Sequence, residues 1–364
     1  MRSSNSLNKN SRKKLRFGLV GAGAIAQSYI EAFESCSEAH LVAVADPRFD
    51  AAQRIGERMR CRSYDCVERM LADCKLEAAV VCTPPATHAD ICVTVMQRGI
   101  HVLCEKPFST DVLGARRMLG AAEQAGVKLT MASKFRYVED VIRARSIIAS
   151  GLLGELILFR NVFATCVNMS SRWNSRPAIS GGGVLIDNGA HSVDLIHYFL
   201  GPLAVVHARE GKRTQGLQVE DTVFLVGRSV NGVVCNIELS WSITRQDDTF
   251  LEISGALGSI SVGWKRSGRL DYAHRQWMPF GNGYHKIQAF RDQIENFCRA
   301  IRGEEPLLIT AHDGLASVEV IASAYRSLRE NRPIPVSNPS ASSFDSEEPS
   351  SSIAPAPARR ETLQ

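Results

Sequence analysis

LRFGLVGAGAIAQSYIEAF, residues 15–33, combines a short apolar strand, a glycine turn and the start of an amphipathic helix. The turn is the G-x-G-x-x-A form of a dinucleotide-binding loop and reads Gly21, Ala22, Gly23, Ala24, Ile25, Ala26. Gly21 permits the tight turn, Gly23 lets the backbone approach a pyrophosphate, and Ala26 lets the helix pack close to the strand. The phosphates are expected at the helix N-terminus, beside Ala24 and Ile25.

A second apolar strand, HLVAVADP, ends at Asp46, twenty residues beyond the last position of the turn. An acidic residue there can hold the ribose hydroxyls of the adenosine half of a dinucleotide. Asp46 favours NAD because its charge would repel a 2′-phosphate, whereas Arg48 is close enough to pair with one, so NADP is the alternative. Asp46 could also cap the helix that follows Pro47, which is compatible with the ribose role.

The series continues with the strand-like runs AAVVCTPP, IHVLCEKP and VKLTMA, each separated by a helical stretch. This alternation predicts a doubly wound parallel sheet, which binds ligands at the carboxyl ends of its strands. Those ends carry Thr83, Pro84 and Glu105 as expected cofactor contacts, and Lys106, whose cation lies where an alkoxide would need stabilising. His88 follows closely and could face the ligand or make only local hydrogen bonds.

The second half of the chain has a different pattern. Six strand-like segments with alternating apolar and polar residues lie between residues 155 and 263, interrupted by one helix and followed by two amphipathic helices. The fold class is therefore α/β, with an N-terminal doubly wound parallel sheet and a C-terminal α+β domain that has a large, open, mostly antiparallel sheet. We expect a dinucleotide-binding domain at 15–134 and a substrate-binding and oligomerisation domain at 135–336.

The interrupting helix, within GGGVLIDNGAHSVDLIHYFLG at 181–201, has a narrow polar stripe of Asp187, His191, Asp194 and Tyr198. No Lys, Glu or Arg occurs in this segment, which favours a stripe inside a sheltered cleft rather than a solvated face. Asp187 precedes His191 by one turn, so its carboxylate could orient the ring or hold its proton. A structural buried histidine is the alternative.

Composition limits the classes of partner. The formal net charge is +5, and residues 1–14 carry five basic side chains and no acidic one. This basic tail and the Ser/Pro-rich segment 337–364 are expected to be disordered. We expect no nucleic-acid partner, no membrane association and no metal, because the body has no basic helix, no long apolar run and only scattered cysteines. The absence of a signal-like apolar run after the basic start leads us to expect a cytoplasmic protein.

Taken together, the glycine turn with Asp46, C-T-P-P-x-x-H at 82–88, E-K-P at 105–107 and G-G-G-x-x-x-D-x-x-x-H at 181–191 resemble the Gfo/Idh/MocA family of oxidoreductases. The resemblance covers roughly residues 15–335. It implies a Rossmann domain and hydride transfer between NAD(P) and a ring hydroxyl or carbonyl of a sugar, cyclitol or nucleotide sugar. It also implies Lys106 as the catalytic lysine, His191 as the acid/base and Asp187 as their companion in the site. Members often have a cis peptide at this Lys-Pro, so we predict one at Lys106–Pro107.

Substrate contacts are expected from Lys106, Asp187 and His191, and from three further side chains, Arg136, Trp173 and Asn188. Arg136 could bind hydroxyls or an acidic substituent, or could be an interdomain salt-bridge partner. Trp173 could stack on a sugar or merely pack. The family resemblance implies a homodimer or homotetramer formed through the C-terminal sheet. It also leaves two alternative functions, a glycosidase that uses bound NAD for transient oxidation and elimination, and a non-catalytic dinucleotide-binding protein.

Overall fold

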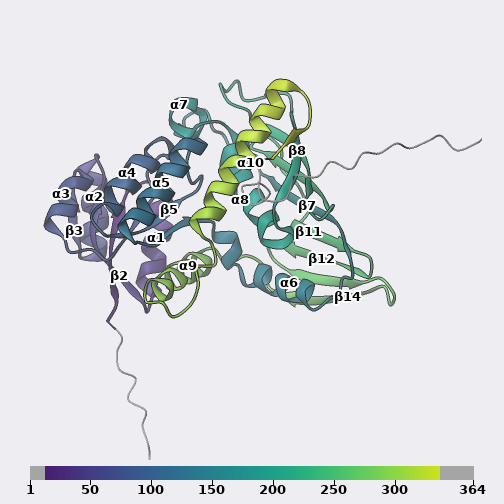
Figure 1. Cartoon of the computed structure of the whole chain (residues 1–364), viewed down its shortest axis with the longest axis horizontal. Helices are drawn as coiled ribbons and strands as arrows, with labels where there is room; N and C mark the ends of the chain where they lie inside the picture. The colour runs from purple at the N-terminus through teal and green to yellow at the C-terminus, as the bar shows by residue number, and fades with distance from the viewer. Residues whose placement is uncertain (1–12, 337–364) are drawn as a thin grey trace, which may run out of the picture.

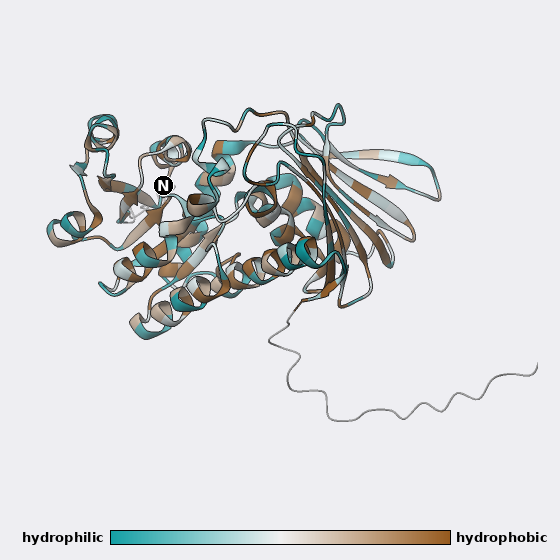
Figure 2. Cartoon of the chain, turned by 90° about the horizontal axis from the view of Figure 1, so that it is seen from above, coloured by the Kyte–Doolittle hydropathy of each residue, from teal (hydrophilic) through white to brown (hydrophobic). Residues whose placement is uncertain are grey.

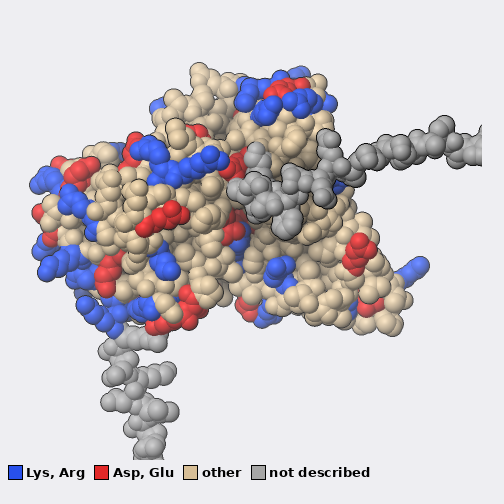
Figure 3. All heavy atoms as spheres, viewed as in Figure 1, with Lys and Arg blue, Asp and Glu red and all other residues tan. Residues whose placement is uncertain are grey.

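A computed structural model describes residues 13–336, which form two sheets with their helices (Figure 1). The tails expected at 1–14 and 337–364 lie outside the described residues, except for Lys13 and Lys14. On the face shown in Figure 3, basic and acidic side chains are mixed. Within residues 13–336, no helix is both long enough and apolar enough to cross a membrane.

The N-terminal sheet has six strands in the order β3-β2-β1-β4-β5-β6, and every neighbouring pair is parallel. Its strands are β1 Leu15–Val20, β2 Ala39–Ala45, β3 Arg62–Tyr64, β4 Ala78–Val81, β5 His101–Glu105 and β6 Leu129–Ala132. Its helices are α1 Ala24–Ser35, α2 Phe49–Met59, α3 Val67–Asp73, α4 His88–Met96 and α5 Val112–Ala125, with the 3₁₀ turn η1 at Pro85–Thr87. The predicted doubly wound parallel sheet is confirmed. The central strand β4 is apolar and buried along its whole length, because helices cover both faces of such a sheet.

The turn between β1 and α1 requires a glycine at position 21, because the backbone after β4 passes close to it. Gly21 has a φ of 101°, and a Cβ atom there would lie 2.8 Å from the carbonyl oxygen of Cys82. Only glycine avoids both the left-handed strain and this contact. The turn therefore seats the start of α1 against the end of β4.

The C-terminal sheet has nine strands in the order β14-β13-β12-β11-β7-β10-β9-β8-β15. They are β7 Leu156–Ala164, β8 Leu203–Glu210, β9 Thr222–Ser229, β10 Val234–Ser240, β11 Thr249–Gly255, β12 Gly258–Gly263, β13 Ser267–Asp271, β14 Gln276–Gly281 and β15 Ile334–Pro335. Only the β7–β10 pair is parallel, so the expected mostly antiparallel sheet is confirmed.

Helices cover one face of this second sheet and leave the other open, as Figure 2 shows. The remaining helices are α6 Glu139–Ala149, α7 Pro177–Ser180, α8 Val184–Leu200, α9 Lys286–Ile301 and α10 Ala311–Glu330, with 3₁₀ turns η2 Lys134–Tyr137 and η3 Trp173–Ser175. Helices α8 and α10 pack on the sheet and on each other. On the open face, Phe224 and Val226 of β9 alternate with buried residues of the same strand.

Helix α9 is an exception to the division suggested by chain order. It packs on α1, and its apolar residues Phe290, Ile294 and Phe297 join the core that lies beneath β1 and α1. An amphipathic helix buries its apolar face against whichever surface is available, and sequence periodicity does not specify that surface. The second half of the chain thus contributes to the core of the first sheet.

Candidate active site

The carboxylate of Asp46 joins the end of β2 to the glycine turn. Its Oδ2 accepts a hydrogen bond from Ala22 N at 2.7 Å, and its Oδ1 accepts from Arg48 N at 2.9 Å and from Arg48 Nε at 3.2 Å. Burial disfavours the charged form, but the hydrogen bonds from Ala22 and Arg48 outweigh it and lower the pKa of Asp46. The Arg48 side chain is 67% exposed, so it is free to move toward a ligand.

The first turn of α1 fits a dinucleotide pyrophosphate. The N-cap residue Gly23 offers no side-chain cap, and a Cβ atom added there would meet nothing within 4 Å. Amide groups at a helix N-terminus that lack an intrahelical partner, beside open space, attract a negatively charged group. Thr83 and Pro84, which are partly exposed, follow β4 at the same edge of the sheet.

His88 differs from the expectation that it contacts the cofactor. Its ring is completely buried, with Nδ1 2.9 Å from the Pro107 carbonyl oxygen and Nε2 2.9 Å from the Thr83 carbonyl oxygen. Both nitrogens are therefore occupied by the backbone of the two loops that follow β4 and β5. The structure favours the local hydrogen-bonding alternative, in which His88 supports these loops instead of binding a ligand.

The site centres on an ion pair between the two halves of the chain. Lys106 follows β5, and its Nζ lies 2.5 Å from Asp187 Oδ1 and 3.2 Å from the Asp187 carbonyl oxygen in the first turns of α8. The Lys106–Pro107 peptide bond is cis, as predicted. The two side chains keep 17% and 21% of their surfaces exposed, so the pair remains accessible. Two segments some eighty positions apart thus meet at the carboxyl end of β5.

Asp187 does not orient the ring of His191, contrary to one interpretation of their spacing. Among the described residues, its carboxylate pairs with Lys106, while His191 Nδ1 lies 3.5 Å from Ser133 Oγ. Phe135 packs against the imidazole edge to face, with ring centroids 4.9 Å apart. Asp187 and His191 lie one turn apart on α8 but contact different residues, Lys106 and Ser133 respectively.

His191 is held in its neutral form. Burial lowers the pKa of its imidazole well below the ordinary histidine value, and the nearby charges of Lys106 and Lys134 lower it further. A neutral imidazole has one ring nitrogen with a free lone pair, so His191 in this form can accept a proton.

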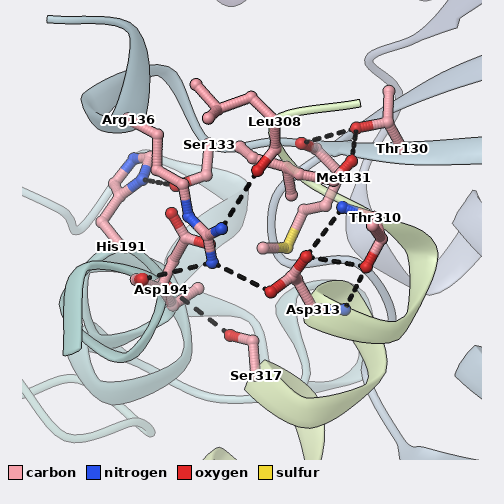
Figure 4. Close-up of polar contacts among 12 residues, drawn as sticks. Thr130, Met131, Ser133, Arg136, His191, Asp194, Leu308, Thr310, Asp313 and Ser317 are labelled. Atoms are coloured by element: carbon pink, nitrogen blue, oxygen red, sulfur yellow. Dashed lines mark hydrogen bonds and ion pairs between the residues drawn. The ribbon is translucent and has the colours of Figure 1, made fainter. Parts of the chain in front are cut away.

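Arg136 links three elements through buried ion pairs (Figure 4). Its Nη2 lies 2.7 Å from Asp194 Oδ1 on α8 and 3.2 Å from Asp313 Oδ1 in the first turn of α10. The Arg136 side chain is 5% exposed and that of Asp194 is fully buried. Of the two alternatives for Arg136, the structure therefore supports the ion-pair partner. The expectation that it contacts substrate is corrected, because both carboxylates already occupy its guanidinium.

The two remaining expected substrate contacts differ in their surroundings. Asn188 is partly buried on α8, and its Nδ2 donates to the Phe163 carbonyl oxygen at 3.3 Å. Trp173 in η3 is 40% exposed. Among the described residues, no three or more His, Cys, Asp or Glu side chains are grouped to hold a metal ion.

Glu220, which sequence reasoning missed, fixes the start of α8. Its Oε1 accepts hydrogen bonds from Gly183 N at 2.9 Å, Leu185 N at 3.1 Å and the Tyr325 hydroxyl at 2.7 Å. A Cβ atom on Gly183 would lie 2.0 Å from the Glu220 carbonyl oxygen, which explains the glycine. A carboxylate at a helix N-terminus is favourable. The contact joins residues 37 apart, and helix or strand periodicity gives no signal of it.

Lys134, the second missed residue, lies just beyond β6 at the same sheet edge as Lys106. Its charge influences the pKa values of Glu105 and His191. Glu105 is buried, with Oε1 accepting from the Tyr29 hydroxyl at 2.8 Å and Oε2 from Lys106 N at 3.1 Å. Lys106 was selected because polar residues that follow a parallel strand lie at the ligand-binding edge of the sheet. Lys134 follows β6 in the same way, so the same rule could have identified it.

Comparisons with known proteins agree with this architecture. Residues 15–133 match the model of the oxidoreductase family with an NAD-binding Rossmann fold, and residues 141–261 match the GFO/IDH/MocA C-terminal domain. The chain is 28% identical over 344 residues to an inositol 2-dehydrogenase of Rhizobium meliloti, covering 88% of this chain and 99% of that protein. It is 25% identical to a D-glucoside 3-dehydrogenase of Escherichia coli, covering 86% and 95%.

The fold is also shared with solved structures. Levoglucosan dehydrogenase in complex with NADH superposes with a TM-score of 0.83 at 19% identity, over 89% of this chain and all of the other. The two matched models together span most of the described residues, and the two relatives named above are dehydrogenases. The chain therefore belongs to the Gfo/Idh/MocA family of NAD-binding sugar and cyclitol oxidoreductases.

Proposed function

We propose that this enzyme is an NAD-dependent dehydrogenase that oxidises a ring hydroxyl of a sugar, cyclitol or nucleotide sugar, or reduces the corresponding carbonyl. The observation that carries the proposal is the meeting of Lys106 and the α8 residues Asp187 and His191 at the carboxyl end of β5. That edge is where a parallel sheet binds its cofactor. The bound cofactor would supply the acceptor or donor of hydride.

The side chains provide the two functions that alcohol oxidation requires. His191, kept neutral by its burial, would take the hydroxyl proton. The Lys106 ammonium, held in place by Asp187, would stabilise the negative charge that develops on the same oxygen. Asn188, Trp173 and Asp187 would contact other hydroxyls of the substrate. In the reverse direction the same groups would donate the proton to a carbonyl.

The test is a screen of inositols, aldoses, glycosides and nucleotide sugars with NAD and NADP, following absorbance of the reduced nicotinamide. A dehydrogenase produces one reduced cofactor for each molecule of substrate consumed. Cleavage of a glycoside with no net NADH would instead assign the transient-oxidation glycosidase. NADH binding without turnover of any compound would favour a non-catalytic protein.

Asp46→Ala is expected to shift cofactor preference from NAD toward NADP. Loss of hydrogen bonds between the carboxylate and the ribose should raise the KM for NAD about 10- to 100-fold. The freed Arg48 guanidinium would meet a 2′-phosphate. The measurement is kcat/KM for both cofactors. Asp50→Ala, which removes the same charge from an exposed pair with Arg54, should leave the ratio unchanged, and an equal shift in this control would contradict the ribose role.

We also propose that the open face of the C-terminal sheet forms the contact between subunits. Phe224 and Val226 are 44% and 38% exposed there, and Val234 of the adjacent strand β10 is 39% exposed. Phe224→Lys should shift the protein toward the mass of one chain in light scattering after gel filtration, because it places a charge in an apolar contact. Leu113→Lys, equally apolar and 72% exposed on α5, is the control. An unchanged mass for Phe224→Lys would exclude this face.

A further inference from the structure

Lys134 is a cation without a counter-ion beside the proposed reaction centre. Its side chain is partly buried, and among residues 13–336 its ammonium makes no ion pair or hydrogen bond. Its nearest described partners are aromatic, with Nζ 5.4 Å from the ring centroid of Phe135 and 5.8 Å from that of Phe290. A partly buried cation without a counter-ion attracts a ligand of opposite charge, because the lower local dielectric constant strengthens the interaction.

The acidic groups near Lys134 are already occupied. Glu105 accepts hydrogen bonds from the Tyr29 hydroxyl and from Lys106 N, while Asp187 is paired with the Lys106 ammonium. Neither carboxylate forms a hydrogen bond or ion pair with Lys134, although both raise its pKa electrostatically. The positive charge of Lys134 therefore stays uncompensated by direct contact within the described part of the chain.

A second lysine and a helix N-terminus lie on the same side. Lys286 is the first residue of α9, is exposed, and has no ion pair among the described residues. The charge of Lys286 lowers the pKa of Lys134. Phe290, one turn further along α9, has its ring centroid 5.8 Å from the Lys134 ammonium. The N-cap residue His285 provides no side-chain cap, so the first amides of this sixteen-residue helix are available to a ligand.

We propose that Lys134, together with Lys286 and the first turn of α9, binds a negatively charged oxygen group of the substrate. The substrate would then be a sugar or cyclitol derivative that carries a carboxylate or a phosphate. This inference rests on the proposed dehydrogenase function and narrows its substrate class. Lys106 would bind the reacting oxygen, and Lys134 would bind the charged substituent at a different position of the same molecule.

The charge of Lys134 depends on pH in a useful range. Burial lowers its pKa to about 8, Lys106 and Lys286 lower it as well, and Glu105 and Asp187 oppose them. Lys134 is therefore protonated at neutral pH and loses its charge as the pH rises through about 8. Affinity for an anionic ligand should fall over that interval, whereas affinity for a neutral sugar should not follow it.

The test is calorimetric titration of the NADH-loaded enzyme with glucose, glucuronate and glucose 6-phosphate. We expect glucuronate or glucose 6-phosphate to bind at least about tenfold more tightly than glucose, and the better of the two identifies the carboxylate or the phosphate. Lys134→Met should remove this preference. Because one charged hydrogen bond is lost, the affinity for the preferred anion should fall about 10- to 100-fold. Lys134→Arg should keep it and abolish the decline near pH 8.

Lys128→Met is the matched control, because Lys128 precedes β6 at the opposite edge of the sheet, is exposed, and carries the same charge. It should bind all three ligands as the unmodified protein does. Three results would overturn the inference: no preference for either anion over glucose, no binding of any anion, or an equal loss of NADH affinity in Lys134→Met. The proposed dehydrogenase function would survive each of these results, because it depends on turnover that requires His191.

Discussion

His191→Asn is expected to lower kcat by about 10²- to 10⁴-fold, the contribution typical of a positioned general base. Asparagine keeps a polar group of similar size near Ser133 but cannot take up a proton at neutral pH. NADH affinity, measured by fluorescence titration, should remain unchanged, since His191 lies on α8 and the glycine turn lies at the start of α1. The measurement is single-turnover and steady-state kinetics on the substrate that the screen identifies.

The pH profile gives an independent check of the same assignment. The unmodified enzyme should lose kcat/KM as the pH falls through the depressed pKa of His191, because the protonated ring cannot accept the hydroxyl proton. His191→Asn should have no such decline. His197→Asn is the matched control, since His197 lies on the same helix and makes no described contact with Lys106 or Asp187. Near-normal turnover in His191→Asn would remove the proposed mechanism.

Arg136→Met should lower the free energy of unfolding by about 3–5 kcal/mol, the usual cost of removing one partner from a buried ion pair. Burial already raises the pKa of Asp194, and the guanidinium at 2.7 Å is its compensating charge. Methionine would leave that carboxylate in an apolar setting beside α10. The measurement is denaturant unfolding followed by circular dichroism, with the melting temperature as a second readout.

Two variants make this prediction specific. Arg117→Met removes one partner of an exposed pair, since the side chains of Arg117 and Asp90 are 52% and 73% exposed, and it should cost less than about 1 kcal/mol. Arg136→Met combined with Asp194→Leu removes both buried charges and should recover much of the lost stability. Equal destabilisation by the Arg117 and Arg136 single variants would show that the Arg136 ion pairs contribute no more stability than an exposed pair.

Much of the fold follows from short-range patterns. The glycine turn after β1, the apolar runs that became β4 and β5, and the alternating segments of the second sheet each depend on residues within about one element of one another. Periodicity reports such local relations directly. The rule that ligands lie at the carboxyl ends of parallel strands then selected Lys106. The absence of Lys, Glu and Arg from residues 181–201 selected Asp187 and His191 as residues in a sheltered site.

The partners of these side chains were decided by the tertiary structure. The sequence spacing places Asp187 one helical turn from His191. In the structure, however, Asp187 pairs with Lys106, which follows β5, and His191 lies beside Ser133. Arg136 could reach a substrate or a carboxylate, and only the approach of α8 and α10 gave it two carboxylate partners, of which Asp194 is fully buried.

The sequence by itself thus determined the two sheets, the cofactor-binding turn and the segments that carry the chemistry, because hydrophobic periodicity and backbone sterics act over a few residues. Only the tertiary structure decided which ionisable groups meet, which are buried and which stay unpaired, with His88, Glu220 and Lys134 as the clearest cases. The physical reason is that these contacts join residues far apart in the chain, and their energies depend on burial and distance, which exist only once the two sheets have packed together.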